Sequence, residues 1–222
     1  MKVVSLLAAA LLAASSSANA ATVTAKVVAD DYFSVFVGSA DGTSLALVGG
    51  SGGALWYQQG AAFTFNVGSG DYIYVAAWDS ASYGPPHMWI GEFDIGGTKL
   101  VSNTSDWLSK YNASIKDPTI SNVQSLIQSG SWGGIGASAP DGSQPWGDLP
   151  PAFGALQIWH DYFNRAGSND PTSASQNGYA LFRTAVSVVP ADTGGGTVPE
   201  PGTLALLGLG LAGLAASRRR KP

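Results

Sequence analysis

The chain of 222 residues contains no cysteine. This absence excludes disulfide bonds, thiolate metal sites and cysteine nucleophiles. Histidine is almost as scarce, since only His87 and His160 occur, and charged residues make up 12% of the chain. An enzyme needs a positioned acid, base or nucleophile, and few such groups are offered here. The stability of the fold therefore has to come from packing rather than from cross-links.

Positive charge is sparse along most of the chain. Between residues 21 and 198, fourteen acidic residues accompany six basic ones, which gives this part a net charge near −8. A surface of this sign repels other polyanions, so nucleic acid and anionic lipid are poor partners.

The first twenty residues have the pattern of a secretory signal peptide. Lys2 precedes an apolar run over residues 3–14, and the chain then turns small and polar up to Ala18-Asn19-Ala20. Small residues at Ala18 and Ala20 form the A-x-A pattern of a signal-peptidase site, which predicts cleavage between Ala20 and Ala21. An uncleaved anchor helix would need a longer apolar run. We therefore expect export, with residues 1–20 removed.

The last residues predict a short membrane helix. Residues 203–216 carry no charge, and Arg218, Arg219, Arg220 and Lys221 follow at once. At about 1.5 Å per residue the run reaches roughly 20 to 25 Å, against a hydrocarbon core of about 30 Å. The basic cluster should stay cytoplasmic, which places the preceding domain outside. A buried helix of a soluble protein would not explain the basic cluster.

The order Pro199-Glu200-Pro201, apolar helix, arginine cluster resembles the PEP-CTERM sorting signal of bacteria that secrete exopolysaccharide. The resemblance implies that an exosortase, a membrane-embedded enzyme resembling cysteine proteases, recognises Pro199, Glu200 and Pro201 and removes the helix. The protein would then be released or re-anchored outside, after export by the Sec machinery. This resemblance covers residues 199–222 and concerns transport, not the activity of the domain.

Residues 21–190 have the length of a single domain with a real core. The chain holds 29 glycines and 23 aromatic residues, a combination of turn and strand formers that predicts an all-β, jelly-roll-like sandwich. Residues 62–67 alternate strictly, which predicts a half-buried strand with Phe63, Phe65 and Val67 inside. Residues 71–78 are apolar on both faces and should form a central strand. Further strands are expected at residues 32–37, 88–95, 157–159 and 179–189.

A short surface helix is predicted after residue 116. Asp117 would be the N-cap, Pro118 the first helical residue and Gly130 the C-terminal glycine, with an apolar face between Ile120 and Ile127. Residues 131–155 are rich in glycine, proline and serine, which predicts a long ordered loop. Residues 191–198 are expected to form a flexible stalk before the sorting signal at 199–222.

The succession of predicted strands carries a second resemblance, which concerns the domain itself. Residues 29–38, 70–78 and 89–93 resemble successive strands of galactose-binding-like jelly-roll domains, and residues 158–159 with 181–184 resemble another strand pair of that group. In those domains the last pair usually precedes the strand that carries Asp-Asp, whereas here it follows. The resemblance implies a jelly-roll fold, and no ligand-binding residue is carried over from it.

Candidate catalytic groups are few. His160-Asp161 could form half of a dyad, but no Gly-x-Ser-x-Gly motif accompanies it. A glycosidase would need two carboxyl groups across a cleft. The acidic residues near predicted strand ends could supply them, although such residues often only cap turns or face solvent: Asp30, Asp31, Asp79, Glu92 and Asp94. We expect no enzyme activity.

Aspartates in loops are also hard oxygen ligands, and jelly-roll modules often carry a structural calcium ion. No EF-hand or Gly-Gly-x-Gly-x-Asp repeat is present. A structural Ca²⁺ at Asp30, Asp31 and Asp79 is nevertheless a candidate metal site.

The aromatic residues give the clearer indication of binding, because sugars stack their C–H faces on tryptophan and tyrosine. The candidate ligand-binding residues are Trp56, Tyr57, Gln58, Tyr83 and His87, which fall in predicted turns. We expect an exported surface protein that binds matrix polysaccharide without catalysis. The alternatives are a structural matrix or adhesion protein with no small-molecule site and, third, a glycan-acting hydrolase. Exposed aromatics beside acids in one concavity would favour binding, and the absence of any pocket would favour the structural role.

Overall fold

The computed structural model describes residues 20–79, 88–143, 154–160 and 178–190. The chain divides into two compact units, residues 1–191 and 192–222, and every described residue belongs to the first. Residues 1–19 of the predicted signal peptide, the predicted stalk and the sorting segment lie outside the described ranges. Within those ranges no helix is both long enough and apolar enough to span a bilayer, and the membrane helix predicted at 203–216 is not among them.

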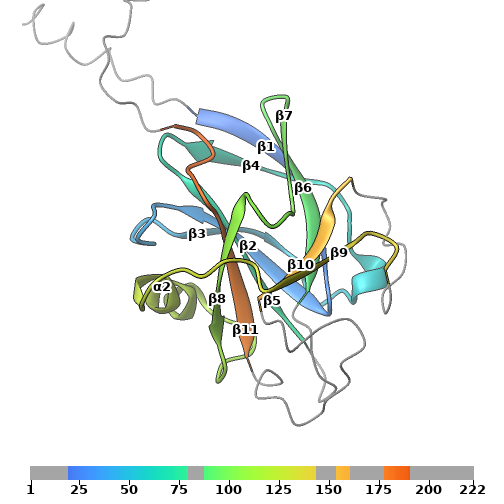
Figure 1. The fold of residues 1–222 in the computed structure, drawn as a ribbon. Helices are drawn as coiled ribbons and strands as arrows, with labels where there is room; N and C mark the ends of the chain where they lie inside the picture. Colours follow the sequence, from blue (N-terminus) through green and yellow to red (C-terminus); the bar gives the residue numbers. More distant parts are fainter. Residues whose placement is uncertain (1–19, 80–87, 144–153, 161–177, 191–222) are drawn as a thin grey trace, which may run out of the picture. The chain divides into compact units, whose positions relative to one another are not determined.

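The described residues form two antiparallel sheets (Figure 1). Sheet A has the order β4-β1-β6-β10-β9, with β7 paired to β6, and sheet B has the order β3-β2-β5-β11-β8. The strand bounds are β1 (Ala20–Ala29), β2 (Tyr32–Gly38), β3 (Ala46–Gly50), β4 (Phe63–Gly68), β5 (Tyr72–Trp78), β6 (Trp89–Ile95), β7 (Thr98–Val101), β8 (Trp107–Asn112), β9 (Ala137–Pro140), β10 (Leu156–Trp159) and β11 (Tyr179–Thr184). The helices are the 3₁₀ turn η1 (Trp56–Gln58) and the α-helix α2 (Ile120–Gln128).

The two sheets pack face to face around one core. Trp89 of β6 lies at its centre, with ring centroids 4.7 Å from Trp107 and 5.8 Å from Phe182, so rings of both sheets meet there. On β4, Phe65 and Val67 point into this core while Thr64 and Asn66 are exposed. The all-β sandwich and the strand face predicted for residues 62–67 are therefore confirmed.

Strand β5 occupies the centre of sheet B, as predicted from its two apolar faces. One face contributes Ile73, Val75 and Ala77 to the core between the sheets. The other contributes a second buried cluster under α2, which includes Tyr74 of β5 with Val123 and Ile127 of the helix. Because α2 covers this second face of β5, the side chains on both faces of the strand are buried and apolar.

The start of α2 differs from the prediction. Thr119 is the N-cap: its Oγ1 accepts a hydrogen bond of 3.3 Å from the backbone N–H of Asn122, and the Asn122 side chain accepts from Thr119 in return. This reciprocal arrangement satisfies backbone donors at the helix start. Asp117 instead has a positive φ of 50°, outside the helix. The prediction of Asp117 as N-cap was wrong because Thr119 and Asn122 together form the better cap.

The end of α2 is held by a buried lysine of β8. The Lys110 Nζ lies 3.0 and 2.8 Å from the carbonyl oxygens of Leu126 and Ile127 and also contacts those of Ser129 and Gly130, so its three N–H donors are shared among four acceptors. A cation at a helix C-terminus satisfies unpaired carbonyls and opposes the negative end of the helix dipole. Burial, and then the nearby Arg183, lower the pKa of Lys110.

The sequence predicted a strand over residues 179–189, but the observed strand is shorter. Strand β11 ends at Thr184. The following residues bond to the turn between β4 and β5: the Val188 N–H donates to the Asp71 carbonyl at 2.8 Å, and the Gly70 N–H donates to the Val189 carbonyl at 2.8 Å. The last described residues are thus fixed to the turn at residues 68–71.

Candidate functional site

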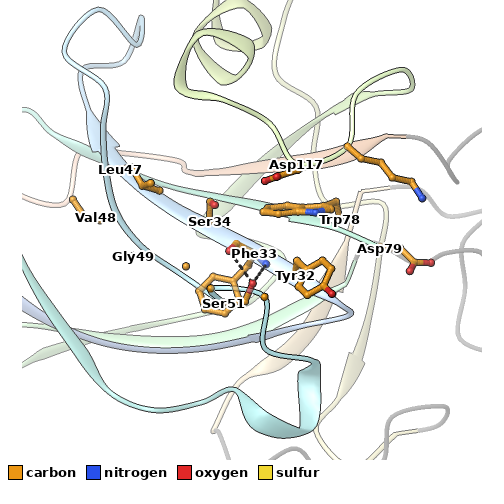
Figure 2. A pocket seen from close by; sticks show the side chains of 14 residues that line it. Tyr32, Phe33, Ser34, Leu47, Val48, Gly49, Ser51, Trp78, Asp79 and Asp117 are labelled. Carbon is orange, nitrogen blue, oxygen red and sulfur yellow. Dashed lines mark hydrogen bonds between the residues drawn. The ribbon is translucent and has the colours of Figure 1, made fainter. Parts of the chain in front are cut away.

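A groove of about 920 Å³ lies over sheet B, where β2, β3 and the end of β5 meet the segment before α2 (Figure 2). It is lined by side chains and backbone of three strands and of three connecting segments, which follow β3, follow β5 and precede α2. The residues that matter for its chemistry are Tyr32, Leu47, Gly49, Trp78, Asp79 and Asp117, with Lys116 beside them.

Two aromatic rings from neighbouring strands form one side of the groove. Tyr32 of β2 and Trp78 of β5 are direct partners in the ladder, and their ring centroids lie 6.0 Å apart at 47°. Trp78 is only 7% exposed, because much of its ring packs in the cluster under α2. Figure 2 shows its ring between Tyr32 and Asp117. The pair offers a limited apolar contact surface whose shape is fixed by the core.

The opposite side of the groove is formed by β3 and the loop after it, where the exposed side chain of Leu47 lies beside a stretch that is mostly glycine. A bulge in β3 pairs Gly49 with Val35 and Leu47 with Phe36, which leaves Val48 as the extra residue. A Cβ at Gly49 would lie 2.3 Å from the Phe63 ring, and because Gly49 pairs with Val35 of the core, a side chain there would point into the core rather than into the groove. Among the described strands, β3 lies at the edge of sheet B, and the outer side of an edge strand carries backbone N–H and C=O groups without ladder partners. Such groups suit a ligand that donates and accepts hydrogen bonds.

The charged residues of the groove are mostly acidic. Asp79 is buried, Asp117 is exposed and Lys116 is half-buried. A positive φ is uncommon outside glycine, although aspartate tolerates it better than most residues. Asp117 adopts it directly before Pro118, a position that normally favours extended backbone. Strain of this kind tends to occur at functional sites, and here it lies at the rim of the groove.

The turn that the sequence predicted to bind ligand, residues 56–58, does not form a flat, exposed binding surface. Trp56 is half-buried and packs against the cluster of Val28, Ile90 and Trp159 on sheet A. Tyr57 is 55% exposed, but its ring meets Trp56 edge-on, at 5.6 Å and 89°, so the two do not form one flat surface. Gln58 is exposed, and its Oε1 accepts from the Leu55 N–H at 3.3 Å. Tyr83 and His87 lie outside the described residues.

Gln59, the next residue, is a structural residue. Its Oε1 accepts a hydrogen bond of 2.8 Å from the Ala29 N–H, and its Nε2 donates to the carbonyl oxygens of Asp31 and Ala54. These bonds tie the turn to the corner where β1 passes into β2. Its amide is therefore occupied inside the fold.

The candidate metal ligands sit at strand ends. Asp30 and Asp31 form the corner between β1 and β2, where their N–H groups donate to the carbonyls of Met88 and Trp78 at 3.1 Å each. Asp79 directly follows β5. In the described part of the chain, no group of three or more histidines and acidic residues is placed to hold a metal ion. A calcium site stays a prediction without support from this geometry.

Other acidic candidates are engaged in the sheet. Glu92 forms ion pairs of 3.3 Å with both Lys26 and Lys99. Burial alone would raise the pKa of Glu92, but hydrogen bonds from the two lysines outweigh it and lower that pKa overall. The Asp94 carboxylate accepts from the Gly97 N–H at 2.7 Å in the β6–β7 turn.

His160 has a partner that the sequence did not indicate. Its Nδ1 lies 2.8 Å from the Oγ of buried Ser109, which is also 2.6 Å from the Gly134 carbonyl oxygen. A carbonyl only accepts, so the serine proton is directed to Gly134 and His160 Nδ1 donates to the serine. The serine is therefore not activated as a nucleophile in this arrangement. Instead, the pair connects β8 of sheet B with the end of β10 in sheet A.

Comparison with known proteins bears on the end of the chain. Residues 197–221 match the family model of the PEP-CTERM protein-sorting motif. No curated protein and no solved structure matches the chain. The match indicates export and membrane-anchored sorting by an exosortase. The resemblance of the sandwich to galactose-binding-like domains is not confirmed.

Proposed function

We propose that this protein is sorted to the cell surface by an exosortase and binds extracellular polysaccharide there without catalysis, through the groove over sheet B. The observation that carries the proposal is the groove itself, which gathers Tyr32, Trp78 and two acidic residues in one concavity. A structural protein with no small-molecule site would need no such concavity. The sorting motif supports the extracellular setting and an exosortase as the processing partner.

The chemistry of the groove fits a neutral sugar chain. The rims of Tyr32 and Trp78 can contact the C–H faces of pyranose rings, and the backbone wall at β3 can exchange hydrogen bonds with hydroxyl groups. The exposed Asp117 carboxylate at the rim of the groove disfavours uronic acids and sulfated sugars, which carry charge of the same sign. The ligand class is therefore an uncharged, hydroxyl-rich polymer.

Binding at each groove should be weak. A shallow contact of this kind corresponds to about millimolar to micromolar affinity, roughly −4 to −8 kcal/mol. Many copies on one surface would raise the effective strength through avidity, because a polymer offers repeated sites to them. Retention of a long polysaccharide is accordingly a more sensitive readout than binding of a single sugar.

The test is affinity electrophoresis of the processed protein, purified from its host, in gels that contain neutral or uronic-acid-rich polysaccharides, with and without calcium. The proposal expects retardation by a neutral polymer, weaker retardation by an acidic one and no release of reducing ends. Absence of retardation by every polymer would favour the purely structural role. Release of reducing ends that stops in Asp117→Asn would favour a hydrolase instead.

A further inference from the structure

Arg183 of β11 lies against two aromatic rings on the face of sheet B that α2 covers. Its guanidinium carbon is 4.7 Å from the centroid of the Tyr72 ring and 4.6 Å from that of the Trp132 ring. All three residues are half-buried, and none of them lines the groove. Contact with aromatic rings stabilises a guanidinium and limits its movement. The charge of Arg183 is therefore presented at a defined position.

The hydrogen-bond donors of Arg183 are only partly used. Its Nη1 donates to the Ala40 carbonyl at 3.3 Å, whereas its Nε is buried and has no hydrogen-bond partner. The Tyr74 hydroxyl beside it, whose own proton goes to the Ser39 carbonyl at 2.6 Å, can accept one further bond. Among the residues that the structure describes, no carboxylate forms an ion pair with Arg183. Since a guanidinium has five N–H donors, some of them remain for a ligand.

A second cation lies close to Arg183. The Lys110 Nζ, on the neighbouring strand β8, is 5.0 Å from the centroid of the same Trp132 ring. Its ammonium is already shared among carbonyl oxygens at the end of α2, so it adds positive charge to the site without a free donor. In the described part of the chain no acid pairs with Lys110 either. Two cations without a carboxylate partner thus meet at one ring, in a domain whose net charge is near −8.

The shape and charge of this site select its ligand. The fork of a guanidinium matches a planar carboxylate through two parallel hydrogen bonds. Asp41 lies in the same loop as Ala40, and its negative charge opposes a dianion more strongly than a monoanion. The half-buried rings of Tyr72 and Trp132 can contact the C–H groups of a sugar ring. A sugar that carries one carboxylate satisfies all three conditions.

We infer that Arg183, Tyr72 and Trp132 form a second binding site, which takes the carboxylate of a uronic acid residue in an extracellular polysaccharide. The site is separate from the groove, because Tyr72 and Trp78 are the two ends of β5 and lie roughly 20 Å apart at about 3.3 Å per residue. The inference shares the extracellular setting with the proposed function, but not its site. The weaker retardation expected with acidic polymers then arises at Arg183 and not in the groove.

The test is affinity electrophoresis of the processed protein in gels with a uronic-acid-rich polysaccharide, with mobility measured relative to a polymer-free gel. We expect Arg183→Gln to weaken the apparent affinity roughly tenfold or more, as for lost hydrogen bonds to a charged group. Arg183→Lys keeps the charge without the fork and should give an intermediate affinity. Lys99→Gln is the matched control, because it removes one charge from a lysine that pairs with Glu92 in sheet A. Equal losses in Lys99→Gln and Arg183→Gln would mean that net charge alone decides, which overturns the site.

A competition experiment uses only the unaltered protein, so it does not depend on how the variants fold. Sodium glucuronate, glucose or inorganic phosphate is added to the acidic gel at equal ionic strength, and we expect glucuronate alone to reduce retardation. Equal competition by phosphate, no competition by glucuronate, or no retardation by the acidic polymer overturns the carboxylate site. If the neutral polymer fails to retard the protein while retardation that depends on Arg183 persists, the proposed function of the groove is wrong and this site stands.

Discussion

The turn at residues 56–59 and the groove over sheet B both combine aromatic rings with polar groups, but they use those groups differently. In the turn, the amide of Gln59 bonds to three backbone groups and that of Gln58 to one. In the groove, the wall at β3 is an edge of backbone and the Asp117 side chain is exposed. Composition therefore indicates where polar groups are present, whereas only their hydrogen-bond partners show whether they remain for a ligand.

The largest effect should follow from Gln59→Ala. The substitution leaves the Ala29 N–H and two carbonyl oxygens without their side-chain partner. Unmade bonds at partly buried groups cost about 1 to 3 kcal/mol each at most, so we expect a loss of about 2 to 4 kcal/mol in the free energy of unfolding. Chemical denaturation measures it. Gln58→Ala is the matched control and should cost less than about 1 kcal/mol, and equal losses would mean that the turn is not clamped by Gln59.

Trp56→Ala should come next. Trp56 is half-buried against the cluster of Val28, Ile90 and Trp159, so its removal should lower the free energy of unfolding by about 1 to 3 kcal/mol. Retention on polysaccharide should be unchanged at temperatures where the variant is folded. An unchanged melting temperature together with lost retention would return the binding site to this turn, as the sequence alone suggested.

The substitution Asp117→Asn tests the role of the exposed negative charge in the groove. Asparagine tolerates the positive φ at this position, so folding stability should change little. Loss of the exposed negative charge should strengthen retention on an acidic polysaccharide by about two- to fivefold, which corresponds to about 0.4 to 1 kcal/mol for an exposed charge. The gain should vanish near 1 M salt, where charges are screened beyond about 3 Å. A gain that persists in high salt would point away from charge repulsion.

Asp41 is expected to give the smallest effect. Its carboxylate accepts from the hydroxyl groups of Ser39 and Thr43 and from the Thr43 N–H, and these bonds lower the pKa of Asp41 to about 2. A carboxyl group whose pKa is lower in the folded state stabilises the fold fully above its unfolded value near 3.8, and this contribution is lost as the pH falls towards 2. The melting temperatures of Asp41→Asn and of the unaltered protein should differ at pH 5 and converge near pH 2. A difference independent of pH would contradict this account.

The strand pattern was predictable where it is local. Alternation at residues 62–67 and the two apolar faces of residues 71–78 follow directly from side-chain chemistry, and both predictions are confirmed. Strand β8 was missed because it contains Ser109 and Lys110, whose polar ends are satisfied by distant groups: Gly134 and His160 for the serine, and the C-terminus of α2 for the lysine. No signal within the strand itself reveals such partners.

The groove was missed for a related reason. Its walls combine β2, β3, β5 and the segment before α2, which only the sheet order brings together. Tyr32 and Trp78 were predicted on strands, but their pairing depends on the register of β2 with β5. The sequence predicted a binding site at the turn of residues 56–59 because its aromatic and amide residues are consecutive in the chain. A site assembled from distant strands needs the register, which one sequence does not supply.

The most direct test compares two tyrosines, Tyr32 at the groove and Tyr57 at the turn. Tyr32→Ala and Tyr57→Ala each remove one ring, and affinity electrophoresis on the neutral polysaccharide retained by the unaltered protein measures the consequence. Near-ultraviolet circular dichroism checks that both variants keep their tertiary packing. We expect Tyr32→Ala to abolish retardation and Tyr57→Ala to leave it unchanged. Retardation that survives Tyr32→Ala but is lost in Tyr57→Ala would contradict the assignment of binding to the groove.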